Sequence, residues 1–283
     1  MELSLKWERS PIQVRVRRMA LNIIVFIKWV PNTQVVNIDP RTGTLIREGV
    51  PSIVNPHDLH AVEFALKLKE KYGGKVTVFS MAPPSALQGI EFVVGMGVDN
   101  GILLSDRAFA GADTLATSYV LANAVKKLGE FDLLIFGQET IDSSTAHIGA
   151  QTASWLNLPY IYYVLEAELV DGGRIRVKRT LERSLEWYEL PLPAVIGVAM
   201  GSNPPRPIRL REKLRARLEK PMETWTNQKL SLDPLCIGLR GSPTRVVKSI
   251  PTPTIPRKKE KFEGDPVEGA RWLVQKLREE GLI

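Results

Sequence analysis

The sequence of 283 residues contains a single cysteine, Cys236, and only three histidines. One cysteine excludes an intramolecular disulfide and a multi-cysteine metal cluster within this sequence. No stretch approaches the roughly 18 to 20 uninterrupted apolar residues of a membrane-spanning helix, and residues 1–18 lack the apolar centre of a signal peptide. With 44% hydrophobic and 24% charged residues, the composition is that of a globular protein. We therefore expect a cytoplasmic protein that does not insert into a membrane.

The signatures of several common catalytic and metal sites are also missing. There is no Gly-x-x-x-x-Gly-Lys-Ser/Thr phosphate loop and no Gly-x-Ser-x-Gly nucleophile elbow. Residues 95–101 contain three glycines, but they link a helix to a strand, whereas a dinucleotide fingerprint links a strand to a helix. His57 and His60 share a helix face without a third ligand at a suitable spacing. We predict no metal site and no catalytic side chain, and we interpret Cys236 as inert.

The formal charge of +7 is concentrated in two segments. Residues 1–18 carry five basic and two acidic residues, and residues 206–220 carry seven basic and two acidic residues. Basic segments can bind nucleic acid through its phosphates, but no groove motif with interleaved aromatic residues accompanies these two. We interpret both as solvated tails or docking arms and predict no nucleic-acid partner. Residues 1–18 are expected to be a basic extension outside the fold.

The first 160 residues alternate between apolar strands and amphipathic helices. Strands are predicted at residues 22–29, 75–80, 101–104 and 131–136, and helices at residues 55–72, 85–94, 113–128 and 145–156. Asn55 is a suitable N-cap, and Pro56 suits the first position of its helix. This alternation predicts an α/β fold with a parallel sheet and helices on both faces. Residues 39–43 are expected to form the turn of a small hairpin.

The pattern changes after residue 160. Residues 166–188 read as two strands around an Asp171-Gly172-Gly173 turn, which predicts an antiparallel hairpin, and residues 192–200 read as a buried strand. Residues 201–261 are rich in proline and basic residues with little core of their own, so we expect them to lie on something else, such as a partner subunit. A closing helix is predicted at residues 266–280. The expected regions are 1–18, an α/β nucleotide-binding domain at 19–200, and a C-terminal arm at 201–283.

The most informative loop is residues 137–149, which follows a predicted strand and opens a helix. Ligands of open parallel sheets bind beyond the carboxyl ends of the strands, where the strand order reverses. A helix N-terminus favours phosphate through its free N–H groups and its dipole, and Ser143, Ser144 and Thr145 add hydroxyl donors. His147 is a candidate donor to a phosphate or a ring. The alternative is that Asp142 or Ser143 only caps the helix, and the sequence leaves both interpretations open.

These residues belong to a longer series of motifs at residues 25–31, 54–58, 97–99, 137–149, 192–195 and 203–206. In order and spacing, from about residue 19 to residue 220, the series resembles the beta subunit of electron transfer flavoprotein. The resemblance implies a Rossmann-like fold of the adenine nucleotide alpha hydrolase type, an alpha subunit that carries FAD, and an adenine-nucleotide site on this chain. The implied site residues are Phe26, Lys28, Asn55, His57, Asp58, Met81, Gly137, Gln138, Glu139, Thr140, Ile141, Asp142, Ser143, Ser144, Thr145, Ala146, His147, Ile148 and Gly149.

The resemblance does not decide which of two nucleotides this chain binds. Ordinary members of the family hold a structural AMP, whereas electron-bifurcating members hold a second FAD that accepts a hydride from NADH. Bifurcating members tend to read Asp-Gly-x-Thr-Ala-x-Val-Gly-Pro where this chain has residues 142–150, and Ser143, His147 and Ala150 depart from that pattern. The Asp-Asp-Asp run of AMP-type members is missing, and small residues after Asp142 leave room for a bulky ligand. We favour FAD over AMP, with NADH as a substrate and enzymatic activity only in the FAD case.

Residues 203–220 resemble the recognition loop of the same family, with Leu210 at the position that anchors partner dehydrogenases. Their basic side chains suit an acidic surface on a dehydrogenase or quinone-oxidoreductase partner. The resemblance therefore implies a subunit that passes electrons between NADH or a dehydrogenase and acceptor proteins. A stand-alone nucleotide-binding protein of the same fold is the remaining alternative, although the Ser-Gly-Gly-x-Asp-Ser and His-x-Gly-His signatures of enzymes on such sheets do not occur.

Overall fold

The computed structural model describes residues 20–32, 37–38, 45–46, 51–244 and 259–283. The chain divides into two units, Met1–Arg245 and Val246–Ile283. The described part of the second unit contains one helix, α7 (Pro266–Glu279), close to the predicted closing helix. Asp265 caps this helix by accepting hydrogen bonds from the backbone N–H groups of Val267 and Glu268. The extension at residues 1–18 lies outside the described residues.

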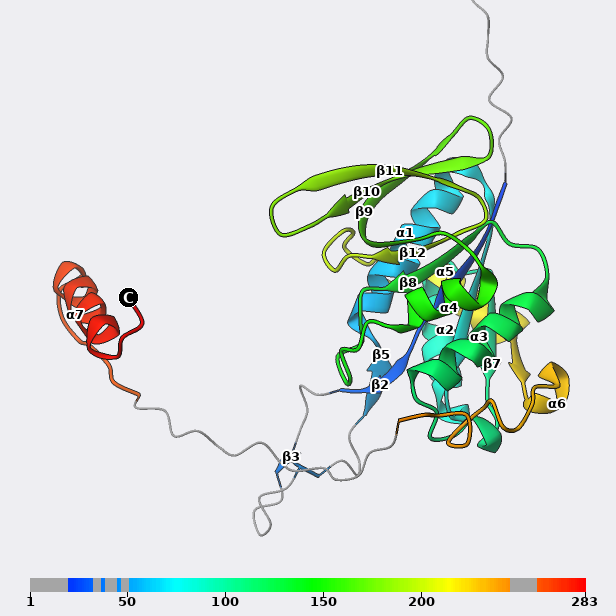
Figure 1. Cartoon of the computed structure of the whole chain (residues 1–283), viewed down its shortest axis with the longest axis horizontal. Coiled ribbons are helices and arrows are strands. Elements are labelled where there is room, and N and C mark those ends of the chain that lie inside the picture. The colour runs from blue at the N-terminus through cyan, green and yellow to red at the C-terminus, as the bar shows by residue number, and fades with distance from the viewer. Residues whose placement is uncertain (1–19, 33–36, 39–44, 47–50, 245–258) are drawn as a thin grey trace, which may run out of the picture. The chain divides into compact units, whose positions relative to one another are not determined.

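The first unit is built on a twisted nine-stranded sheet (Figure 1). Across the sheet the order is β11, β10, β9, β12, β8, β1, β6, β7, β13, and neighbouring strands from β9 to β13 run parallel. The strands are β1 (Leu21–Phe26), β6 (Gly74–Met81), β7 (Asn100–Leu104), β8 (Leu133–Gly137), β9 (Tyr160–Val170), β10 (Arg174–Thr180), β11 (Leu185–Pro191), β12 (Ala194–Val198) and β13 (Met222–Trp225). The predicted α/β fold is confirmed.

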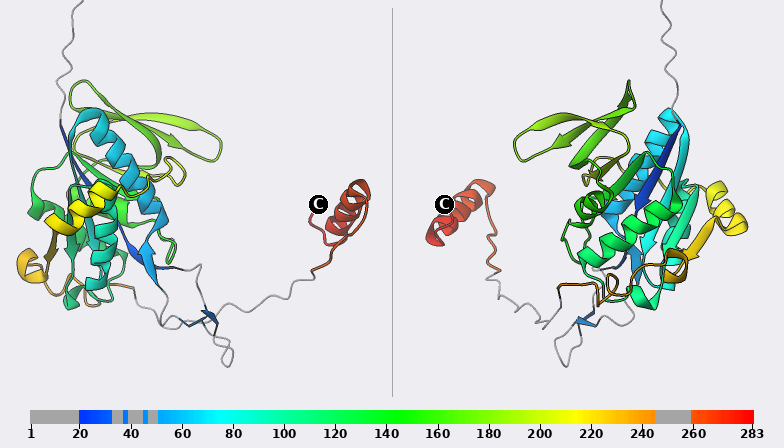
Figure 2. Two further views of the ribbon diagram at one scale, coloured as in Figure 1. Left: turned by 180° about the vertical axis from the view of Figure 1, so that it is seen from behind. Right: turned by 45° about the vertical axis from the view of Figure 1, so that its right-hand side comes forward.

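Helices cover both faces of the sheet, as the reverse view in Figure 2 also shows. Alternate residues of β1 point to opposite faces, so Ile23 and Val25 pack with α1 and α2 while Ile24 and Phe26 pack with α3. Strands buried on both faces explain the nearly continuous apolar runs of the sequence. The helices of this unit are α1 (Pro56–Tyr72), α2 (Leu87–Met96), α3 (Thr114–Leu128), α4 (Ile148–Leu156), α5 (Leu210–Glu219) and α6 (Asn227–Leu230).

Two further strand pairs lie outside the main sheet. β2 (Trp29–Pro31) pairs with β5 (Ser52–Val54), and β3 (Asn37–Ile38) pairs with β4 (Leu45–Ile46), both antiparallel. The second pair is the predicted small hairpin, although its turn at residues 39–44 lies outside the described residues. The predicted helix ends at Asp113 and Gly129 are confirmed, because Asp113 caps α3 at its start and Gly129 follows its last residue.

Three sequence predictions need correction. The predicted antiparallel hairpin is confirmed as β9 and β10, but its second strand ends at Thr180. The residues after it form a third strand, β11, which pairs with β10 along its whole length. The helix predicted from residue 145 begins at Ile148. The segment after residue 201, expected on a partner, lies on this unit as far as Thr244, since β13 extends the sheet beside β7 and Thr244 donates hydrogen bonds to Asp113.

The strand order has a switch point at the centre of the sheet, and the space beyond the strand ends at this point is called the crevice below. From β1 the chain crosses to β6 and β7 on one side and then returns to β8 and β12 on the other side. The order therefore reverses between β1 and β8, and the segments after these two strands diverge at their carboxyl ends. Among the residues with a described structure, no helix is long and apolar enough to cross a membrane.

Candidate functional site

Lys28 and the loop after β8 meet at the strand switch point. Lys28 follows β1, and its Nζ atom donates to the two carboxylate oxygens of Asp142 at 2.9 and 2.8 Å and to Oγ of Ser143 at 3.3 Å. The Ser143 hydroxyl also lies 2.8 Å from the hydroxyl of Thr140. Residues from two strand ends that are 114 positions apart are thus in direct contact. Burial alone would raise the pKa of Asp142, but hydrogen bonds from Lys28 and Thr140 lower it below its usual value, so its carboxylate is ionised at neutral pH.

Asn55 fixes the beginning of this loop. Its side chain is fully buried, and it donates to the carbonyl of Glu139 at 2.7 Å and accepts from the N–H of Ile141 at 3.2 Å. Asn55 stands directly before α1, but within the described chain its side chain makes no cap bond to the helix, contrary to the sequence prediction. One amide can satisfy a backbone donor and a backbone acceptor together, so this side chain positions the loop.

Asp58 lies beneath the same crevice, on the first turn of α1. It is 5% exposed, and its carboxylate accepts the backbone N–H of Lys28 at 2.7 Å. Gly137 passes so close to Asp58 that any side chain at Gly137 would overlap the carboxylate and the backbone of His57. Burial raises the pKa of Asp58 to about 7, against hydrogen bonds from Lys28 and Asn55 that lower it. The residues that end β1 and β8 and the first turn of α1 therefore surround one buried carboxyl group.

The raised pKa of Asp58 makes stability depend on pH in a defined direction. Between about pH 4 and pH 7 the folded chain keeps a proton that the unfolded chain has released. The contribution of Asp58 to the free energy of unfolding is therefore largest below about pH 4, falls as the pH rises to about 7, and then levels off. Asp58→Asn, which stays neutral, is expected to lose this decline.

Urea unfolding of the full chain at pH 5, 6, 7 and 8 measures the effect as the difference between wild type and Asp58→Asn, because other titrating groups are common to both. The wild type is expected to lose stability relative to the variant between pH 5 and 7. If the free energies of unfolding of wild type and Asp58→Asn changed with pH in parallel, Asp58 would ionise as an ordinary carboxyl group.

The loop between β8 and α4 contains left-handed residues that end its turn. The N–H groups of Ser143 and Ser144 both donate to the carbonyl of Thr140, at 3.3 and 2.8 Å. Ser144 and Ala146 have φ angles of 46° and 54°. α4 then begins at Ile148 without a side-chain cap in the described chain. Asp142 and Ser143 therefore lie several residues before the helix and do not cap it, so that alternative is wrong.

Tyr162 on β9 holds the loop from the other side, and the sequence did not identify it. Its hydroxyl donates to the carbonyl of Gln138, and the side-chain oxygen of Gln138 accepts the N–H of Met200 at 3.0 Å. A Cβ atom at Gly197 would overlap the ring of Tyr162. Sequence signals were present in the closely spaced Tyr160, Tyr162 and Tyr163 and in a glycine within a buried strand.

The other predicted site residues have different surroundings. His57 is buried, its Nδ1 atom has no hydrogen-bond partner among the described residues, and burial lowers its pKa, so its ring is neutral at pH 7. Phe26 is a core residue stacked on Phe136, with ring centroids 4.2 Å apart. Thr145 and His147 are exposed. Met81 and Ile148 are half-buried against the α3 side of the core.

The residues present suit a nucleotide. A lysine, several hydroxyl groups and the uncapped start of α4 form a donor set that favours phosphate. The unpaired Nδ1 of buried His57 is a polar atom that a ligand could satisfy, since buried polar atoms normally have partners. Gly137 allows the loop to approach Asp58 closely. Lys28, His57 and Gly137 all lie around the carboxyl ends of β1 and β8.

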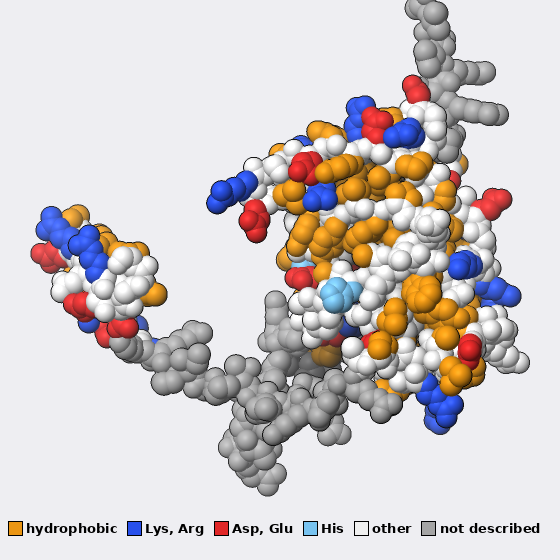
Figure 3. All heavy atoms as spheres, in the orientation of Figure 1, with side chains coloured by type: hydrophobic (Ala, Val, Ile, Leu, Met, Phe, Trp, Pro, Cys, Tyr) orange, Lys and Arg blue, Asp and Glu red, His pale blue; other side chains and the backbone are white. Residues whose placement is uncertain are grey.

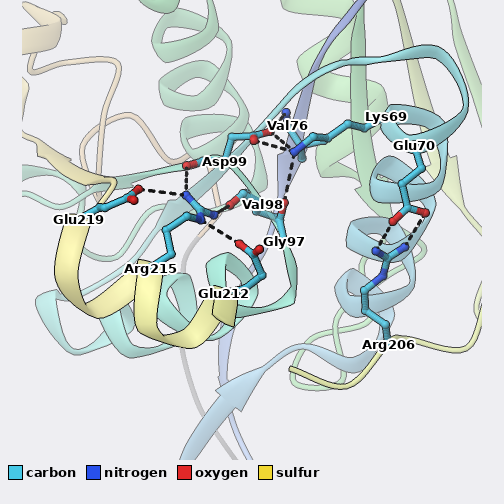
Figure 4. Close-up of polar contacts among 10 residues, drawn as sticks. All are labelled: Lys69, Glu70, Val76, Gly97, Val98, Asp99, Arg206, Glu212, Arg215 and Glu219. Carbon is cyan, nitrogen blue, oxygen red and sulfur yellow. Dashed lines mark hydrogen bonds and ion pairs between the residues drawn. The ribbon is translucent and has the colours of Figure 1, made fainter. Parts of the chain in front are cut away.

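The predicted partner-recognition residue lies on a separate helix, α5. Leu210, Leu214 and Leu218 are 73%, 49% and 81% exposed, and their spacing of four residues aligns them on one face. On the side of α5 that meets the protein, Ala216 is buried in the hydrophobic core, and Arg215 makes polar contacts beside it. Arg215 donates to the carbonyls of Val98 and Asp99 at 2.6 and 3.3 Å (Figure 4). The three leucines of α5 are therefore exposed although a smaller residue, Ala216, packs in the core.

Ion pairs tie the segment before α5 to α1. Arg206 binds both carboxylate oxygens of Glu63 at 2.7 and 3.0 Å. It also binds Glu70, as Figure 4 shows. The Arg206 and Glu63 side chains are only 15% and 4% exposed. Lys67 donates to the side chain of Asn203 at 2.7 Å. Charged contacts with α1 and with the turn that follows α2 therefore hold α5 in place, together with the packing of Ala216 in the core.

The fold defines an α/β protein with a candidate ligand site at a strand switch point, and comparisons with known proteins specify its family. Residues 42–230 match the electron transfer flavoprotein domain. The chain is 42% identical over 263 residues to the electron transfer flavoprotein subunit beta of Clostridium acetobutylicum, and 41% identical over 263 residues to that of Thermoanaerobacterium thermosaccharolyticum. It is 41% identical over 270 residues to the caffeyl-CoA reductase-Etf complex subunit CarD of Acetobacterium woodii.

Each of these three alignments covers 93% of this chain and the whole of the relative. The chain belongs to the electron transfer flavoprotein family, among its beta subunits. Membership supports a role in an electron transfer flavoprotein and an association with flavin or nucleotide. Relatives named as beta subunits also imply an alpha subunit as partner.

Proposed function

We propose that this chain binds an adenine nucleotide in the crevice beyond β1 and β8, with FAD favoured and AMP as the alternative. With an alpha subunit, it passes electrons between NADH or a dehydrogenase and an acceptor protein. The observation that carries the proposal is the convergence of Lys28, Asn55, Asp58 and residues 137–149 at the point where the strand order reverses.

The protein groups have binding and positioning roles in this proposal. Lys28, the hydroxyls of Ser143 and Ser144 and the start of α4 hold the phosphates, while Asn55 and Tyr162 keep the loop in place. Neutral His57 offers Nδ1 to the nucleoside. A bound flavin would supply the electron chemistry, so no side chain of this chain needs to act as an acid or base. The small side chains of Ser144 and Ala146 support the choice of FAD.

An exposed apolar surface beside the loop supports coverage by the alpha subunit. Figure 3 shows hydrophobic side chains gathered over the face on which β9 and α4 lie. Trp155 on α4 and Tyr163 on β9 are 43% and 37% exposed, and Met200, which contacts Gln138, is 56% exposed. Extended apolar patches of this kind mark protein interfaces. A subunit seated here would lie next to the proposed nucleotide.

Nucleotide content tests the proposal. The chain is co-expressed with its alpha subunit, the purified complex is denatured, and the released nucleotides are identified by chromatography and mass spectrometry. Two FAD per heterodimer are expected. One FAD and one AMP would retain the site but replace the favoured ligand by the alternative. A heterodimer whose only nucleotide is one FAD would contradict the proposed site on this chain.

The leucine face of α5 is proposed to dock a dehydrogenase or quinone-oxidoreductase partner. Five exposed basic residues flank it, namely Arg209, Arg211, Lys213, Arg217 and Lys220. This charge suits a partner with an apolar groove and an acidic rim. Leu210→Ala is expected to raise the KM for the partner roughly tenfold or more, as for an interface hot spot, because Leu210 is a highly exposed leucine whose side chain is free to enter a groove.

Leu235→Ala provides the matched control, since Leu235 is 68% exposed but lies outside α5. It is expected to leave the KM for the partner unchanged. The nucleotide content of both variants is expected to equal that of wild type. Equal effects of the two substitutions would show that α5 is not the docking site.

A further inference from the structure

The ammonium group of Lys28 is fully engaged within the chain. A lysine ammonium has three N–H donors, and Lys28 uses them on the two carboxylate oxygens of Asp142 and on Oγ of Ser143. Lys28 is also the only lysine or arginine in the segments that follow β1 and β8, residues 27–32 and 138–147. Lys28 is the cation best placed to bind an anionic ligand, and it already binds the carboxylate of Asp142.

The other charges of the crevice do not attract a phosphate. Glu139 and Asp142 belong to the same loop, and Asp58 is buried below it. With Asp142 paired to Lys28, residues 27–32 and 138–147 offer an incoming phosphate no unpaired lysine, and they add the charge of Glu139. Two anions on one ammonium repel each other in partly buried surroundings. A phosphate and the Asp142 carboxylate therefore compete for Lys28.

The loop can release Asp142 without losing its own fold. The turn is closed by backbone bonds from Ser143 and Ser144 to Thr140, and it is anchored by Asn55 at Glu139 and Ile141. None of these bonds uses the Asp142 carboxylate. The side chain of Asp142 is 27% exposed, so it has solvent to enter when it leaves Lys28.

We propose that Asp142 occupies the place of a ligand phosphate on Lys28 and that nucleotide binding exchanges one anion for the other. The inference rests on the proposed function, because it assigns the phosphate of that nucleotide to Lys28. Asp142 is then a specificity-determining residue. It reduces the affinity of every ligand that binds Lys28 through a phosphate, and it leaves the affinity of a ligand without a phosphate unchanged.

Calorimetric titration of the heterodimer, after removal of its own nucleotide, tests the exchange with AMP, ADP and adenosine. ADP contains the adenosine and diphosphate that FAD also contains, and adenosine has no phosphate. Asp142→Asn keeps the size of the side chain and removes its charge. The variant is expected to bind AMP and ADP about threefold to tenfold more tightly than wild type, with the affinity for adenosine unchanged.

Two further variants complete the test. Lys28→Gln is expected to weaken AMP and ADP binding and to abolish the effect of Asp142→Asn in the double variant. Asp171→Asn removes the same charge from an exposed turn between β9 and β10 and is expected to change nothing.

The sign of the change separates the exchange from other roles of Asp142. Weaker binding of both adenosine and AMP by Asp142→Asn would mean that Asp142 binds the nucleoside, which overturns the exchange. Weaker or unchanged binding of AMP and ADP alone would also overturn it. If neither AMP nor ADP binds the wild-type heterodimer, the proposed function itself fails, and the exchange fails with it.

Discussion

Asn55→Ala is expected to release most of the nucleotide from the heterodimer. The substitution removes the partners of the Glu139 carbonyl and the Ile141 N–H, at the start of the loop that holds the phosphates. Unsatisfied buried polar groups cost about 1–3 kcal/mol, and the loop avoids that cost by moving away from Lys28. We expect the affinity for the nucleotide to fall roughly tenfold to a hundredfold. Titration of the nucleotide-free heterodimer measures the change.

Asn123→Ala is the matched control, because Asn123 also makes a side-chain bond to the backbone, from Nδ2 to the carbonyl of Tyr119 on α3. It is expected to retain the nucleotide fully. A retained nucleotide in Asn55→Ala would mean that the loop is held without its amide anchor, and the positioning role of Asn55 would be wrong.

Arg206→Met is expected to destabilise the first unit more than any other substitution considered. It leaves the carboxylate of Glu63, which is 4% exposed, without its cation. Breaking one partner of a buried ion pair costs about 3–5 kcal/mol, because a charge remains in a poorly solvated place. We expect a loss of that size in the free energy of unfolding, measured by urea titration of the full chain.

Two variants separate the loss of the buried pair from the loss of a positive charge. Arg217 pairs with Glu91 at 3.3 Å, and both side chains are more than one third exposed. Arg217→Met is therefore expected to cost about 0–1 kcal/mol. The double variant Arg206→Met with Glu63→Gln is expected to recover part of the stability, because it removes the buried charge. Equal costs for Arg206→Met and Arg217→Met would contradict the account of this pair.

Most strands and helices could be predicted because their signals are local. β1 and β8 are nearly continuous apolar runs, and Asp113 and Gly129 mark the ends of α3. The position of residues 222–244 could not be predicted, because the buried apolar residues Trp225, Leu230, Leu232 and Ile237 follow no regular period. They are buried by α3 and the sheet, which the local sequence does not contain.

The residues of the candidate site could be predicted in part. A loop with three hydroxyl residues after a strand indicated a phosphate site, and the family resemblance added Lys28, Asn55 and Asp58. Neither source indicated that Lys28 pairs with Asp142, that Asn55 anchors the loop, or that Tyr162 supports it. These contacts join residues from different strand ends, and single residues of common types give no local signal for such pairs.

The structure of the heterodimer purified with its own nucleotide tests the central claim most directly. We expect an adenine nucleotide in the crevice beyond β1 and β8, with a phosphate within hydrogen-bond distance of Lys28 Nζ and of residues 143–149. In that complex, the carboxylate of Asp142 is expected to have left Lys28. A nucleotide bound elsewhere on this chain, or on the alpha subunit alone, would contradict the site proposed for it.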